Sequence, residues 1–226
     1  MVIKIFALAT VLILGTGAAS AAVVTNGSFE LDPGVISQGV GGHGRGAVFS
    51  QLPEKKGRNW GIWTSGVAGW SSDANGIEFQ TTRTLGPNLS PSDGSYYVEL
   101  DTRRNSRIFQ NVNLNPGRYN LSFDYAPRVN SNTSNDISVT LGGYVDELVS
   151  SSYSGGARSW TTFNYSFDVK SAGLVELGFA ARGGSNSLGG LLDNVDISTV
   201  PLPGGLVFLL SALVGFGVLR RSQTAA

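Results

Sequence analysis

The chain contains no cysteine, one histidine and few charged residues. Only 14% of its 226 residues are Asp, Glu, Lys or Arg, and 16 basic residues balance 16 acidic ones. The absence of cysteine excludes disulfides and thiol nucleophiles, so the fold must be stabilised by its hydrophobic core. A single histidine without cysteine excludes metal sites built on clusters of these ligands. A formal net charge of zero gives no electrostatic attraction to phosphates, so we expect no nucleic-acid partner.

Helical periodicity is also missing between residues 23 and 199. Apolar residues recur there at every second position, and Val98 and Leu100, for example, share a face that we expect to be core. Asn115-Pro116-Gly117 is a turn signal between two such runs. Together with 31 glycines, this pattern predicts a single all-β domain. We expect residues 23–199 to form a jelly-roll β-sandwich of about eight or more antiparallel strands.

The first 22 residues have the pattern of a secretory signal peptide. Lys4 precedes an apolar run from Ile5 to Leu14, and the small residues that follow include Ala19-Ser20-Ala21, which fits a cleavage site. The apolar run is too short for a membrane helix and ends in glycine and alanine instead of charged residues. We therefore expect residues 1–22 to direct export and to be removed.

Residues 200–226 combine a proline-containing spacer, an apolar segment and two arginines. The spacer is Val200-Pro201-Leu202-Pro203, the predicted membrane helix covers residues 204–219, and Arg220-Arg221 follows it. Because Lys and Arg resist translocation, the arginines should stay in the cytoplasm while residues 23–199 lie outside. At roughly 1.5 Å per residue the apolar part barely spans a hydrocarbon core of about 30 Å, which suits a transient anchor.

This tail resembles the PEP-CTERM sorting signals of Gram-negative bacteria, in the variant with a Val-Pro-Leu-Pro signature. The resemblance implies recognition by an exosortase-type protease, a transient stay in the inner membrane, and removal of the tail. It also implies a final place on the outer surface or in an extracellular matrix, where polysaccharide is the expected partner. A permanent membrane anchor is the alternative.

The region between the two signals resembles the galactose-binding-like jelly rolls, which include carbohydrate-binding modules. The resemblance rests on Asn26-Gly27-Ser28-Phe29-Glu30, Gly69-Trp70, Ile77-Glu78, Asp93-Gly94, Tyr97-Val98-Glu99-Leu100-Asp101 and Leu192-Asp193-Asn194-Val195. It implies that the first of these motifs lies beside the closing strand, where some relatives bind a structural calcium ion.

A physical argument for calcium concerns Asp193. This residue is in phase with Leu191, Val195 and Ile197, so it should point inward, where a carboxylate needs compensation. A calcium ion could supply it, with Glu30 and backbone carbonyls as further ligands. The alternative is a hydrogen-bonded aspartate at a strand end, or a bulge that swings the side chain outward.

Sugar binding requires flat aromatic rings and planar polar side chains, because a pyranose has apolar C–H faces edged by hydroxyls. Trp60 and Trp63 lie on opposite faces of an extended chain, so only one of them should face a ligand. Trp70, in contrast, is expected in the core. The candidate ligand-binding residues are Trp60, Trp63, Tyr97, Arg103, Asn105 and Trp160.

The sequence offers little material for an active site, since it has no second histidine and no Gly-x-Ser-x-Gly motif. The remaining candidate is a carboxylate pair, Glu78 with Glu99 or Asp101, as acid and base in glycoside cleavage. We expect these acids instead on solvated strand faces. The sequence thus predicts an exported, non-catalytic, carbohydrate-binding surface protein. The alternatives are a structural or adhesive matrix protein without specific glycan recognition, and a glycoside hydrolase.

Overall fold

The structure is a computed structural model, and it describes residues 23–31, 60–65, 67–73, 75–82, 84–85, 89–130, 133–150 and 158–201. The predicted signal peptide and the tail from residue 202 onward lie outside these ranges. Within them, no helix has the length and apolar character needed to cross a bilayer. Val200 and Pro201, which begin the predicted sorting motif, are exposed and directly follow the last strand.

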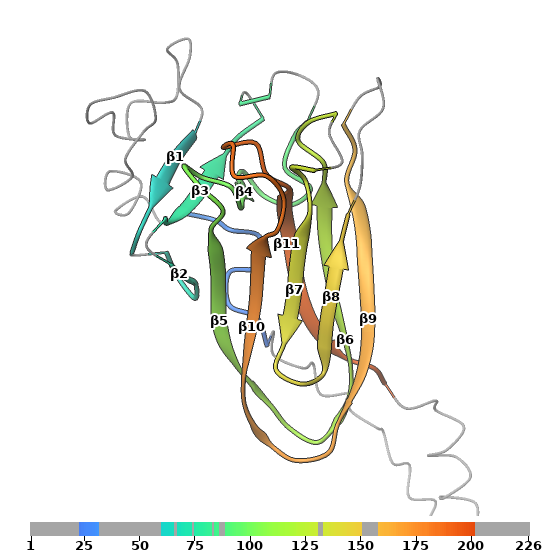
Figure 1. Ribbon diagram of the computed structural model, residues 1–226. Helices are drawn as coiled ribbons and strands as arrows, with labels where there is room; N and C mark the ends of the chain where they lie inside the picture. Colours follow the sequence, from blue (N-terminus) through green and yellow to red (C-terminus); the bar gives the residue numbers. More distant parts are fainter. Residues whose placement is uncertain are drawn as a thin grey trace, which may run out of the picture.

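In the described residues, eleven strands form two antiparallel sheets (Figure 1). The sheet orders are β1-β3-β4-β11-β6-β9 and β2-β5-β10-β7-β8. Along the chain the strands are β1 (Trp60–Trp63), β2 (Ser71–Ser72), β3 (Ile77–Gln80), β4 (Tyr97–Glu99), β5 (Arg107–Leu114), β6 (Gly117–Ala126), β7 (Ile137–Leu141), β8 (Val145–Val149), β9 (Thr161–Val169), β10 (Gly173–Ala181) and β11 (Leu191–Thr199). In Figure 1, β5, β10, β7 and β8 lie in front of β11, β6 and β9. The predicted all-β, jelly-roll type of sandwich is therefore confirmed.

Apolar side chains fill the space between the two sheets. Val98 and Leu100 are fully buried in this main core, as their alternation with polar neighbours predicted. Trp70 also lies in the core, as expected, and its indole N–H donates to the carbonyl oxygen of Asn26 at 2.9 Å. Phe29 packs against Trp70, with the ring centroids 5.1 Å apart. The segment around Asn26 is thereby attached to the sandwich.

Part-way along the closing strand β11, the side chains switch the face of the sheet to which they point. Its pairing with β6 shifts register between Asp193 and Asp196, and the intervening Asn194 has a φ of 50°. A bulge of this kind inserts an extra residue and reverses the alternation of side chains beyond it. Leu192 and Val195 both lie in the main core, so Asp193 points to the opposite face of the sheet. The bulge alternative is observed, yet Asp193 is fully buried.

Loops cover part of the face of the six-stranded sheet that is turned away from the main core. A second apolar cluster forms there from Leu89, Tyr97, Ala126 and Leu191, with Leu85 and Trp160 packed against it. Strand β4 is therefore buried on both faces, whereas its alternation predicted one core face. The extra cover comes from three loop residues, Leu85, Leu89 and Trp160, which we call the roof.

Candidate functional site

Charged and polar side chains gather on the roofed side of β3 and β4. Glu78 and Gln80 alternate with core residues on β3, and Glu99 lies on β4. The register of the two strands places Glu78 opposite Glu99, and Gln80 opposite Tyr97. Directly opposite residues of an antiparallel pair have Cβ atoms about 4.5–5.5 Å apart. Two buried carboxylates therefore lie side by side.

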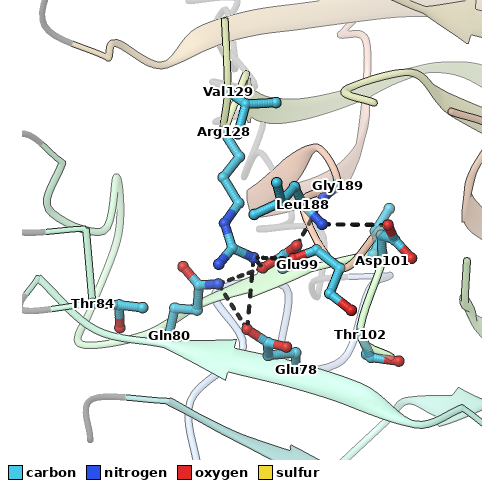
Figure 2. A network of polar contacts seen from close by, with 12 residues as sticks. Glu78, Gln80, Thr84, Glu99, Asp101, Thr102, Arg128, Val129, Leu188 and Gly189 are labelled. Carbon is cyan, nitrogen blue, oxygen red and sulfur yellow. Dashed lines mark hydrogen bonds and ion pairs between the residues drawn. The ribbon is translucent and has the colours of Figure 1, made fainter. Parts of the chain in front are cut away.

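Two side chains hold this pair of carboxylates (Figure 2). The side-chain amide of Gln80 donates to Glu78 Oε1 at 2.9 Å and to Glu99 Oε2 at 2.5 Å. The guanidinium of Arg128, which follows β6, forms an ion pair with Glu99 and lies 3.9 Å from Glu78 Oε1. An arginine between two acids offsets buried charge that would otherwise be costly. We call these four side chains the Arg128 network.

Burial dominates the electrostatics of this network. It raises the pKa of Glu78 from 4.5 to about 7, although Arg128 and the hydrogen bond from Gln80 act in the opposite direction. Burial also lowers the pKa of Arg128, and Glu78 counteracts that effect. Glu78 is therefore poised to exchange a proton near neutral pH.

The loop that precedes β11 is also attached to the network, at the end of the sheet where β6 leads to Arg128. The backbone N–H of Gly189 donates to Glu99 Oε1 at 2.7 Å, and that of Asn186 donates to Asp101 Oδ2 at 2.7 Å. Figure 2 shows Leu188 and Gly189 lying next to the two acids that receive these bonds. The expectation that Glu78, Glu99 and Asp101 occupy solvated strand faces is wrong. Each of the three side chains is covered, and each residue is 3% exposed or less.

Two polar atoms at this place have no hydrogen-bond partner within the described part of the chain. They are the side-chain carbonyl oxygen of Gln80 and the hydroxyl of Tyr97, on directly opposite residues of neighbouring strands. Burial raises the pKa of Tyr97, so its hydroxyl stays protonated at neutral pH. The ring of Trp160 lies edge-on to that of Tyr97, with the centroids 5.5 Å apart. An aromatic pair and two free polar atoms thus border the Arg128 network.

The predicted aromatic ligand platforms are placed differently from one another. Trp63 is 1% exposed and packs edge-on against Phe79 in the main core, so its ring has no open face. Trp60 is half-buried, on the opposite face of β1. Trp160 is half-buried in the roof, where its indole N–H donates to the carbonyl oxygen of Ser90 at 2.7 Å. Of the predicted aromatic residues, the structure brings together only Tyr97 and Trp160.

The two predicted polar ligand residues lie on another loop, which follows β4. Arg103 is exposed, whereas Asn105 is half-buried. The side-chain amide of Asn105 donates to the carbonyl oxygen of Gly183 at 2.9 Å. Asn105 therefore connects two loops at one end of the sandwich, and these loops are different from those that carry the roof residues.

Gln80 and Arg128 are the network members that the sequence reasoning missed. Gln80 could have been found, because its parity with Glu78 in β3 puts both on one strand face. Arg128 follows a buried strand and one proline, a position that gives no sign of its partners on β3 and β4. Its role depends on contacts between segments far apart in sequence.

Glu30 and Asp193, the predicted calcium ligands, both bind the same backbone segment. Glu30 Oε1 accepts from the N–H of Ser95 at 2.7 Å. Asp193 Oδ2 accepts from the N–H of Ser92 at 2.7 Å and of Asp93 at 3.1 Å. Burial raises the pKa of Asp193 to about 7, and these hydrogen bonds oppose the rise. Donors from the protein thus occupy both acids, and calcium at this position stays a prediction.

Any metal bound by the described residues would need oxygen ligands beyond acidic side chains. No cluster of three or more Asp, Glu, His or Cys side chains suited to a metal occurs in that part of the chain. Calcium also accepts backbone and amide carbonyl oxygens, so this finding concerns only the side chains counted.

The chain is similar to solved structures of sugar-binding and adhesin domains. One is TmCBM61 in complex with β-1,4-galactotriose: 18% identity, TM-score 0.44, covering 59% of this chain and 90% of that one. A second is a family 35 carbohydrate-binding module from Clostridium thermocellum: 22% identity, TM-score 0.37, covering 47% and 80%. A third is the K1 cleaved adhesin domain of Lys-gingipain from Porphyromonas gingivalis: 14% identity, TM-score 0.43, covering 63% and 98%.

No protein-family model matches the chain, and no curated protein matches it. With identities of 14–22% and TM-scores of 0.37–0.44, the three structures remain similarities and assign neither ligand nor activity to this chain.

Proposed function

We propose that this domain is a non-catalytic polysaccharide-binding module displayed outside the cell, and that it recognises a sugar unit through Tyr97, Gln80 and Trp160. The observation that carries the proposal is the pair of buried polar atoms without partners, Gln80 Oε1 and Tyr97 Oη. A buried polar group without a hydrogen bond is costly, so such a pair favours a ligand that supplies one. Sugar hydroxyls both donate and accept, which complements one carbonyl and one phenol.

The neighbouring groups have the chemistry that sugar recognition uses. Trp160 offers an indole beside Tyr97, and Arg128 holds a planar guanidinium on the same side of the sheet. Access requires a local movement of the roof, because Tyr97 is fully buried. A substantial minority of complexes rearrange a loop on binding, and the proposal requires that behaviour of the roof.

The proposed role is non-catalytic because the acids that could cleave a glycoside have other partners. Glu99 receives donors from Gln80, Gly189 and Arg128, and Glu78 shares the Gln80 amide. Each is almost fully buried. An acid and base for glycoside cleavage must flank the scissile bond and leave room for it. Export and sorting by an exosortase-type protease are part of the same proposal and rest on the sequence signals alone.

A glycan array followed by affinity electrophoresis tests the binding function with Tyr97→Phe. The change removes one hydroxyl, so we expect glycan affinity to fall about tenfold or more. Stability should stay equal or rise, because the removed hydroxyl has no partner among the described residues. The matched control is Tyr144→Phe, at an exposed tyrosine between β7 and β8. It should leave affinity unchanged.

Three outcomes of this experiment would count against the proposal. Retention of no glycan at all would favour the structural or adhesive matrix protein. Equal retention by the wild type and Tyr97→Phe would move the ligand site elsewhere. Sustained release of reducing ends from a polysaccharide would overturn the non-catalytic assignment.

A further inference from the structure

A short loop beside the Arg128 network is closed by an antiparallel bridge between Asp101 and Asn105. Residues directly opposite in such a bridge project their side chains to the same face, with Cβ atoms about 4.5–5.5 Å apart. Both side chains contact the loop that precedes β11. Asp101 Oδ2 accepts from the N–H of Asn186 at 2.7 Å, and Asn105 Nδ2 donates to the carbonyl oxygen of Gly183 at 2.9 Å.

The other polar atom of each side chain has no such contact. Asp101 Oδ1 and Asn105 Oδ1 are buried and lack a hydrogen-bond partner in the residues that the structure describes. Asp101 as a whole is 0% exposed. A carboxylate oxygen and an amide carbonyl oxygen are both acceptors, so they cannot satisfy each other. Whatever satisfies them must carry positive charge or donate hydrogen bonds.

The charges around Asp101 favour a cation. The three buried acids here are Glu78, Glu99 and Asp101. Among the ion pairs between described residues, Arg128 is paired with the first two and not with Asp101. Arg103 and Arg104, on the bridged loop, are exposed and form no ion pair within the described ranges. A buried carboxylate without a counter-charge is unfavourable.

We propose that Asp101 Oδ1 and Asn105 Oδ1 are ligands of a calcium ion at the base of the bridged loop. Calcium takes 6–8 oxygen ligands and accepts carboxylate, amide and backbone carbonyl oxygens together with water. One carboxylate and one amide predict weak binding, in the range of about 0.1–1 mM that extracellular modules use. This site is separate from Glu30 and Asp193, and it does not depend on the proposed sugar binding.

Calcium chloride, added to the purified full-length chain during thermal unfolding, tests the site. At about 10 mM calcium we expect the midpoint to rise by roughly 3–11 °C. Magnesium should raise it less, because it holds its water more firmly and demands octahedral geometry. Asp101→Asn should abolish the calcium-dependent shift. Its new amide group can donate to Asn105 Oδ1, so the variant should fold.

Asn105→Asp is the matched gain-of-charge variant. A second carboxylate should lower stability without calcium, because the like charges repel, and should increase the calcium-dependent shift. If a water molecule fills the site instead, Asn105→Asp will be destabilised and calcium will not restore it. That result would overturn the proposal.

Two further variants distinguish this calcium site from the one predicted at Glu30 and Asp193. Glu30→Gln and Asp193→Asn should keep the full calcium-dependent shift if the ion binds at Asp101. Loss of the shift in Asp193→Asn, with the shift retained in Asp101→Asn, would place calcium at the closing strand and refute the present site. An unchanged midpoint of the wild type with calcium would also refute it, whatever the outcome of the glycan measurements.

Discussion

At the scale of single residues, burial beneath loops determines how the acids on β3 and β4 behave. Glu78 alternates with core residues just as a solvent-facing acid would, yet it is 3% exposed because loops lie over it. Burial raises its pKa from 4.5 to about 7. The folded protein therefore binds a proton at this residue over a pH range in which the unfolded chain has released it.

The sign of the resulting pH dependence is opposite to that of an ordinary salt-bridged acid. The stability that Glu78 contributes is fully present below about pH 4.5 and is lost as pH rises through about 7. We expect the free energy of unfolding to fall by about 2–3 kcal/mol over that range from this residue. Glu78→Gln should remove this part of the fall in urea titrations at several pH values.

The control for this measurement is Asp168→Asn, at an exposed carboxylate on β9. It should leave the pH dependence as it is in the wild type. Because burial also raises the pKa of Asp193 to about 7, some fall should persist in Glu78→Gln. A pH profile identical in Glu78→Gln and the wild type would show that Glu78 is ionised throughout.

At the scale of elements, two acids from opposite ends of the domain's sequence hold the segment before β4. Glu30 Oε1 binds the backbone N–H of Ser95, and Asp193 Oδ2 binds that of Ser92. Gly94 lies between them with a φ of 63°, and a Cβ added there would come within 2.7 Å of Glu30 Cδ. The segment therefore depends on a glycine that lets a carboxylate approach the backbone.

Gly94→Ala should displace Glu30 and strain the backbone, at a cost of about 1–3 kcal/mol. Gly143→Ala, in the turn between β7 and β8, is the control, since a Cβ there would meet nothing within 4 Å. Chemical denaturation of both variants measures the difference. Equal stability of the two would mean that the segment can move away from Glu30 without loss.

At the scale of the whole molecule, alternation in the sequence was sufficient to predict the sandwich, because strand faces repeat with period two. It placed Val98 in the core correctly, whereas the core position of Trp70 was expected from the Gly69-Trp70 motif of the resemblance. Alternation could not predict the roof or the ion pairs of Arg128. Both depend on contacts between segments far apart in sequence, and such contacts leave no periodic pattern in the sequence. The bulge in β11 also breaks the period, which is why Asp193 was expected in the main core.

The two ends of the folded domain bear on the predicted removal of both terminal segments. Val24, two residues after the predicted signal peptide of residues 1–22, is part of the core. At the other end β11 finishes at Thr199, and the N–H of Val200 donates to the carbonyl oxygen of Arg118 at 2.8 Å. Removal of residues 1–22 and of the tail beyond Val200 would therefore leave all eleven described strands in place.

We expect an intact-mass measurement on native protein from the producing cell to show loss of both ends. The mass should correspond to a chain that starts near Val23 and stops within the first few residues after Thr199. Arg220→Ala combined with Arg221→Ala should leave the tail attached, because we propose that these charges keep the end of the chain on the cytoplasmic side of the membrane. Full-length protein recovered from the cytosol, with both apolar ends present, would contradict export. A membrane-bound chain that keeps its tail would instead support the permanent anchor.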